Sequence, residues 1–134
     1  MNRTYLLNAV EGIATASGYT FYSDSEQRMP QQITAYPAVW LSPPQFTSME
    51  GRKRGKVTYS LTLHAMNEGA KLSPAQRQQE WSQLEDFLVD LFAQLSEKER
   101  IAVVDKLKIK HSSSTLTTHG EVAATATAEV VTFF

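Results

Sequence analysis

Two segments of the chain place their apolar residues at three- and four-residue steps, the spacing of one face of an α-helix. The first covers residues 3–17 and is followed by Gly18, a residue suited to the left-handed turn that ends helices. The second begins at Ser73 and runs to about Leu95, and its first residues, Ser-Pro-Ala-Gln, form a capping-box arrangement. The pattern predicts two amphipathic helices.

Five other segments alternate or cluster apolar and β-branched residues as β-strands do. They cover residues 19–22, 37–41, 56–66, 105–111 and 121–134. Residues 56–66 alternate apolar side chains with Thr, Ser and His, which is typical of a strand with one buried face. In the last segment one face is a row of alanines, whose small side chains would let a helix lie close to the sheet. We expect the helix of residues 81–95 to lie there.

The order of these elements predicts a single α+β domain covering residues 1–134, a length that suits one domain. The expected architecture is an antiparallel β-sheet with two main helices packed on one face, in the order α-β-β-β-α-β-β. Residues 23–32 and 67–72 are polar or rich in turn residues and are predicted to be loops.

The composition excludes several classes of protein. Thirteen Lys and Arg against fourteen Asp and Glu give a net charge of -1, which argues against a globally basic nucleic-acid binder. Cysteine is absent, which excludes disulfide scaffolds, cysteine-ligated zinc, iron–sulfur clusters and thiol catalysis. No run approaches the roughly 18 apolar residues of a membrane span, so we expect no membrane partner. The polar N-terminal residues are not expected to be a secretory signal.

The residues that most often carry catalysis or bind metals do not group in the sequence. The three histidines are His64, His111 and His119, and no two have the spacing of metal ligands. Asp86 and Asp90 are four residues apart on the helix face opposite the apolar one, which favours a solvated face over acid–base chemistry. We therefore expect no catalytic, metal or cofactor site. A small enzyme would need His64 and a carboxylate to meet in a pocket.

Basic residues concentrate in two places. Residues 51–56, Gly-Arg-Lys-Arg-Gly-Lys, hold four of the thirteen, without a phosphate-loop or dinucleotide-binding pattern around them. This tip is interpreted as a solvated hairpin, a contact with a partner protein, or a nucleic-acid contact. Lys106, Lys108 and Lys110 line one face of a strand, where they either pair with Glu121 and Glu129 or extend a basic patch.

Acidic residues concentrate elsewhere, since residues 80–105 hold seven acids against two bases. Opposite charges on different parts of one small domain favour a head-to-tail contact between copies, which closes into a ring when the rotation allows. The candidate protein interface consists of Arg52, Lys53, Arg54, Lys56, Asp86, Phe87 and Asp90.

The order of elements resembles that of the tail terminator and tail-completion proteins of tailed phages, including minor tail proteins of prophages. The resemblance lies in a Pro-led strand (residues 36–41), a long strand (57–64), an acidic helix (81–92) and a last strand rich in Ala, Thr and Val (121–133). It covers most of the chain as a pattern, without a signature motif.

The resemblance implies a structural role. Proteins of this family form a hexameric ring that caps the tail tube and offers a surface to the head-side connector, with no cofactor and no catalysis. It further implies a homo-oligomer whose partners are tail-tube and connector proteins, located in the bacterial cytoplasm during assembly and then in the virion tail. The hairpin of about residues 43–56 would reach a neighbour or the tube. The alternative is a small nucleic-acid-binding module that uses residues 51–56, for which binding would depend steeply on salt.

Overall fold

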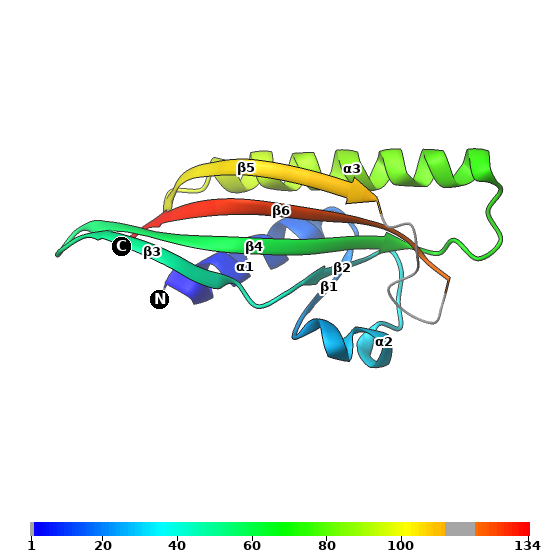
Figure 1. Cartoon of the computed structure of the whole chain (residues 1–134), viewed down its shortest axis with the longest axis horizontal. Coiled ribbons are helices and arrows are strands. Elements are labelled where there is room, and N and C mark those ends of the chain that lie inside the picture. Colours follow the sequence, from blue (N-terminus) through cyan, green and yellow to red (C-terminus); the bar gives the residue numbers. More distant parts are fainter. Residues whose placement is uncertain (1, 112–119) are drawn as a thin grey trace.

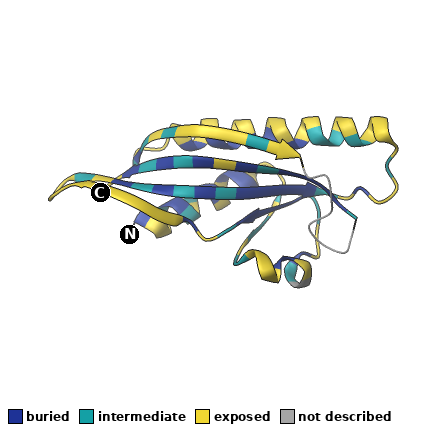
Figure 2. Cartoon of the chain, viewed as in Figure 1, coloured by how far each residue is buried: buried dark blue, intermediate teal, exposed yellow. Residues whose placement is uncertain are grey.

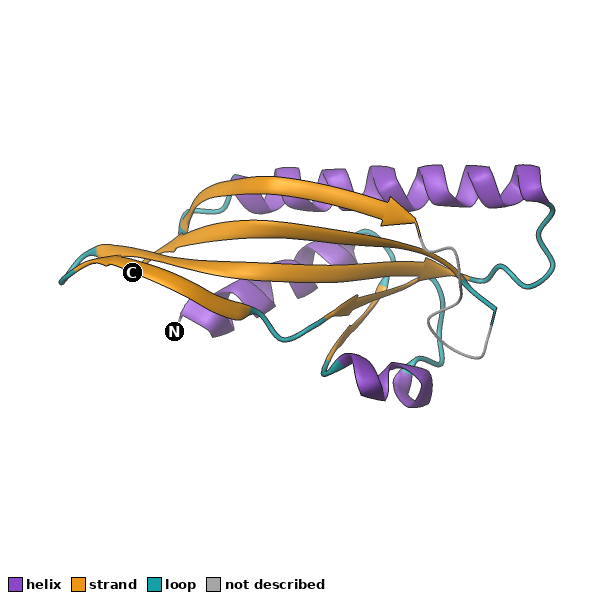
Figure 3. Ribbon diagram, in the orientation of Figure 1, coloured by secondary structure: helices purple, strands orange, loops and turns teal. Residues whose placement is uncertain are grey.

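The structure, a computed structural model, describes residues 2–111 and 120–134. It is an α+β fold in which two long helices lie on one face of a sheet (Figures 1 and 3), as predicted, but the sheet has six strands and not the five expected. In chain order the elements are α1 (Asn2–Ala16), β1 (Thr20–Ser23), the 3-10 turn η1 (Glu26–Arg28), α2 (Met29–Gln32), β2 (Ala38–Leu41), β3 (Gln45–Gly51), β4 (Gly55–Asn67), α3 (Pro74–Ser96), β5 (Ile101–His111) and β6 (Val122–Phe133).

The strands follow the order β1-β2-β4-β6-β5, and β3 pairs with the part of β4 that β2 leaves free. The central pair, β4 and β6, keeps one antiparallel register from Lys56 opposite Phe133 to Asn67 opposite Val122. Four of the five pairings are antiparallel, as predicted, but β1 and β2 are parallel. The sheet of the described residues is therefore mixed.

The strand β3 was not among the predicted strands, and the structure explains why. All seven of its residues are exposed, so no buried face imposes an alternation of apolar and polar residues. The strand exists because β4 is long enough to pair with it from Gly55 to Ser60. Together they form a hairpin closed by residues 52–54.

The main core lies between the sheet and the two long helices. The alanine row of β6 is fully buried at Ala124 and Ala126 and nearly so at Ala128, beneath α3 (Figure 2). This confirms the expected position of the second helix. The predicted capping box is also present, because Gln76 N donates to Ser73 Oγ at 3.3 Å and Ser73 N donates to Gln76 Oε1 at 2.9 Å.

A smaller core lies on the opposite face of the sheet, under η1 and α2. Its buried residues are Met29, Ile33, Ala38, Trp40, Met66 and Ala123. Residues 26–32 were predicted to be loop, and they form short helical turns instead, since Met29 and Ile33 must reach the sheet. No helix of the described residues is long and apolar enough to cross a bilayer.

Enlarging a residue of the alanine row tests the close packing of α3 on β6. We expect Ala126→Leu to lower the free energy of unfolding by about 1–3 kcal/mol, because the added atoms have no space between strand and helix. The control is Thr127→Leu, an exposed neighbour on the other face, which should change that free energy by less than about 0.5 kcal/mol. Urea denaturation measures both, and equal effects would contradict the packing.

Candidate functional site

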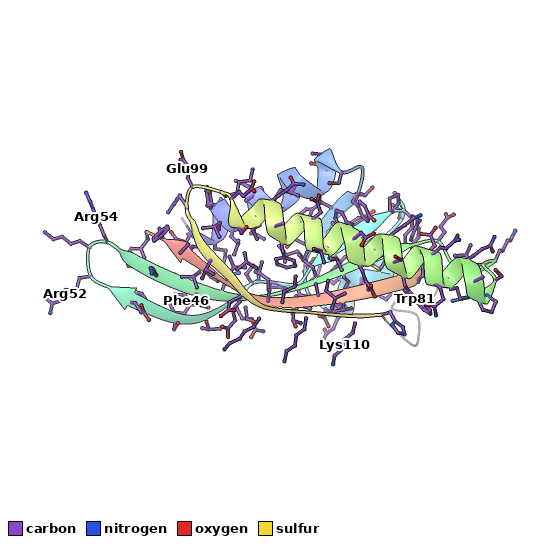
Figure 4. The ribbon with its side chains drawn as sticks, turned by 90° about the horizontal axis from the view of Figure 1, so that it is seen from above. Phe46, Arg52, Arg54, Trp81, Glu99 and Lys110 are labelled. Atoms are coloured by element: carbon purple, nitrogen blue, oxygen red, sulfur yellow. The ribbon has the colours of Figure 1, made fainter. Side chains whose placement is uncertain are left out.

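The hairpin formed by β3, residues 52–54 and the first half of β4 projects past both long helices, and we call it the arm (Figures 1 and 3). Figure 4 shows Arg52 and Arg54 at its tip, pointing away from the rest of the molecule. Both glycines of the tip are required, because Gly51 has φ +97° and a Cβ at Gly55 would collide with the Glu50 carbonyl oxygen. Arg52, Lys53 and Arg54 are all exposed, so the tip holds its cations in solvent.

Contacts at its base and beside its tip hold the arm to the rest of the domain. Arg3 Nη2 donates to the Pro44 carbonyl at 2.6 Å, and its guanidinium lies 5.6 Å from the centre of the Tyr59 ring. On the other side of β4, Phe134 N donates to Gly55 O at 3.0 Å. Arg3 therefore holds the base of the arm, and Phe134 pairs with β4 next to the tip.

The second half of the candidate interface lies on α3. Asp86 and Asp90 are exposed, and Asp90 accepts a hydrogen bond from Gln94 at 2.6 Å. None of the ion pairs within the described residues involves an acid of α3, so this face keeps its negative charge. In one copy the arm tip lies beyond the end of α3 (Figure 4), so tip and acidic face cannot meet within a single molecule.

Two of the candidate interface residues lie apart from these surfaces. Phe87 is only 9% exposed, and its ring stacks on Tyr19 with the centroids 3.7 Å apart, so it belongs to the core. Lys56 is exposed on the face of the sheet away from the long helices, where its Nζ lies 5.9 Å from the centre of the Phe133 ring. The surface that remains consists of Arg52, Lys53 and Arg54 at the tip and Asp86 and Asp90 on α3.

The lysines of β5 do not extend the basic tip. Lys106 lies at a bulge and has φ +56°. Its Nζ is 3.5 Å from Glu129 Oε2, so the expected pairing with Glu129 is present. Glu121 is buried. Lys108 and Lys110 are exposed and lie opposite Thr127 and Thr125.

The register gives the separation between these lysines and the arm. Phe133 of β6 pairs with Lys56, which lies next to the arm tip. Thr127 and Thr125, the partners of the two lysines, lie six and eight residues further along β6. At about 3.3 Å per residue the separation is roughly 20–26 Å. The basic residues therefore form two separate groups rather than one track.

His64 does meet a carboxylate, as the enzyme alternative required. The imidazole is almost fully buried, with Nδ1 2.8 Å from Thr125 Oγ1 and Nε2 3.0 Å from Glu26 Oε1. Ser42 Oγ also donates to Glu26 Oε1, at 2.8 Å. A cavity of about 550 Å³ lies between residues 33–36 and 68–72, but His64 and Glu26 do not line it. The contact instead fastens η1 to the sheet.

This network determines how Glu26 titrates. The hydrogen bond with His64, and then the one from Ser42, hold the pKa of the Glu26 carboxyl below its ordinary value. Sequence reasoning did not find Glu26, because it lies in a polar stretch 38 residues before His64 and carries no periodic signal.

The remaining histidines and the other candidate ligands gather into no site. His111 lies against Trp81, with the ring centroids 4.5 Å apart, and His119 is outside the described residues. Within the described ranges no three His, Asp or Glu side chains are placed to hold a metal ion. Comparison with models of known protein families gives no match, and comparison with proteins of curated function finds no relative.

The Glu26 contact predicts how stability depends on pH. Because the folded pKa lies below the unfolded one, its contribution is present above about pH 4.3 and is lost as the pH falls through the folded pKa. We expect Glu26→Gln to lower the free energy of unfolding at neutral pH and to flatten its decline in acid, measured by urea denaturation across this range. Glu11→Gln, at an exposed position of α1, is the control and should keep the wild-type profile. An unchanged acid slope in Glu26→Gln would contradict the contact.

Proposed function

We propose that the chain is a structural subunit of a phage or prophage tail, similar to tail terminators, which forms a ring at the end of the tail tube or at the head–tail junction. The observation that carries this proposal is the separation of opposite charges on one domain. A basic tip projects from one end, and an uncompensated acidic face lies on α3, where the same copy's tip cannot reach it. Such surfaces suit head-to-tail contacts, which close into rings.

The partners in this proposal are further copies of the chain, the tail tube and the connector on the head side. The subunit would act without a cofactor or a catalytic step, first in the bacterial cytoplasm and then in the virion. The order of elements supports this assignment, since the expected α+β arrangement with a long hairpin between the second predicted strand and β4 is present.

The nucleic-acid alternative has less support from the arrangement of charges. Proteins that follow a nucleic-acid backbone present a continuous basic stripe or groove. In this chain the tip and the lysines of β5 are separated by roughly 20–26 Å along the sheet, and Lys106 pairs with Glu129. The tip alone offers few phosphate contacts.

Solution mass tests the ring. We expect light scattering to give a species near six times 15.0 kDa that grows with protein concentration. Its mass should fall between about 0.1 M and about 1 M salt, because the Debye length shrinks from ~10 Å to ~3 Å and screens the charged contacts. A monomer under all conditions would contradict self-assembly. Binding to DNA with a steep salt dependence would favour the alternative instead.

A further inference from the structure

The arm carries an apolar surface that neither long helix covers. Phe46 is 58% exposed and Met49 56% exposed, and they are the two most exposed large apolar side chains of the described residues. The register places Phe46 opposite Tyr59 and Met49 opposite Val57, so both lie on the face of the sheet that α1 and α3 cover elsewhere. Phe134, opposite Gly55 on that face, is also exposed. We call Phe46, Met49 and Phe134 the arm patch.

A sheet face of this kind normally packs against a helix. The rest of this face follows that rule, but the arm runs out past the ends of both helices (Figures 1 and 4). The cations of the tip lie next to the patch, since Arg52 follows Met49 by three residues and comes directly after the end of β3. The missing partner should therefore be a helix with an apolar side chain beside acidic ones.

The outer face of α3 has this chemistry. Val89 is 52% exposed there, although every other large apolar residue from Leu84 to Leu95 is buried. Glu85 and Asp86 lie one helical turn before Val89, where they are its surface neighbours, and Asp90 follows it directly. On α3, one apolar side chain lies among three acids. On the arm, apolar side chains lie beside three cations, so the two surfaces are complementary.

We propose that the arm patch of one copy docks on the Val89 face of α3 in a second copy, with Arg52, Lys53 and Arg54 facing Glu85, Asp86 and Asp90. This inference rests on the proposed ring and names the surface that closes it. The contact is heterologous, so each copy uses its arm on one neighbour and its α3 on the other. The apolar contact supplies affinity at the centre, and the charges select the orientation and speed the encounter.

Complementary charge reversal tests the pairing directly. The first variant, R52E/K53E/R54E, has an acidic tip and an acidic α3, and the second, E85K/D86K/D90K, has a basic tip and a basic α3. Each variant alone should be monomeric, because like charges meet at every contact. An equal mixture should recover the wild-type mass in light scattering, because each acidic surface then meets a basic one. All six positions are exposed, so both variants should keep the wild-type circular dichroism spectrum.

Truncating the apolar side chains separates this contact from general charge attraction. F46S/M49S and V89S should each raise the dissociation constant about tenfold or more, as anchor residues of an interface do. The matched control is V103S, which truncates an exposed apolar residue on the opposite face of the sheet and should change that constant less than about threefold.

The outcomes separate this inference from the ring itself. A wild-type ring that persists unchanged in F46S/M49S, or charge variants that fail to recover mass on mixing, would overturn the arm–α3 contact and leave the ring standing. Equal losses in V103S and V89S would also overturn it. A wild-type chain that stays monomeric at every concentration would overturn both.

Discussion

The long register between β4 and β6 is the constraint on which the rest of the structure depends. It pairs the two strands without interruption from Lys56, next to the arm tip, to Asn67 at the other end of β4. β4 also carries β2 and β3 on its other edge, one after the other. Because β4 is longer than the helices that cover the sheet, its first residues emerge from the core and become the arm.

The two faces of this sheet are closed in different ways. On one face, the small side chains of β6 bring α3 close, and the core is formed by aliphatic packing. On the other face, a smaller core and the His64–Glu26 contact hold η1 and α2 in place. A buried imidazole with both ring nitrogens bonded is costly to leave unpaired, so Glu26 and Thr125 stabilise this side of the domain.

The proposed assembly follows from what these packing requirements leave uncovered. The helix-facing side of the sheet is apolar along its length, but the helices end before the arm does. The acidic side of α3 faces solvent, and none of the ion pairs within residues 2–111 and 120–134 involves it. In the proposed ring, a second copy supplies a helix for the uncovered arm and cations for the acidic face.

The sequence by itself determined the elements whose signals are local. The capping box at Ser73, the apolar stripe of α3, the alternation of β4 and the alanine row of β6 each depend on spacing within one segment, and all are present. The candidate tip and acidic face were also readable, because charge and exposure follow from local composition.

Only the tertiary structure decided the features that depend on pairing between segments rather than on a pattern within one segment. It formed β3 from a fully exposed segment, made β1 and β2 parallel, and joined His64 to Glu26. It also buried Phe87, which looked like an interface residue, against Tyr19. For β1, His64 and Phe87 the deciding partner lies far away in the sequence, and β3 pairs with its neighbour β4 through exposed residues that show no alternation, so no periodicity along the chain could report these features.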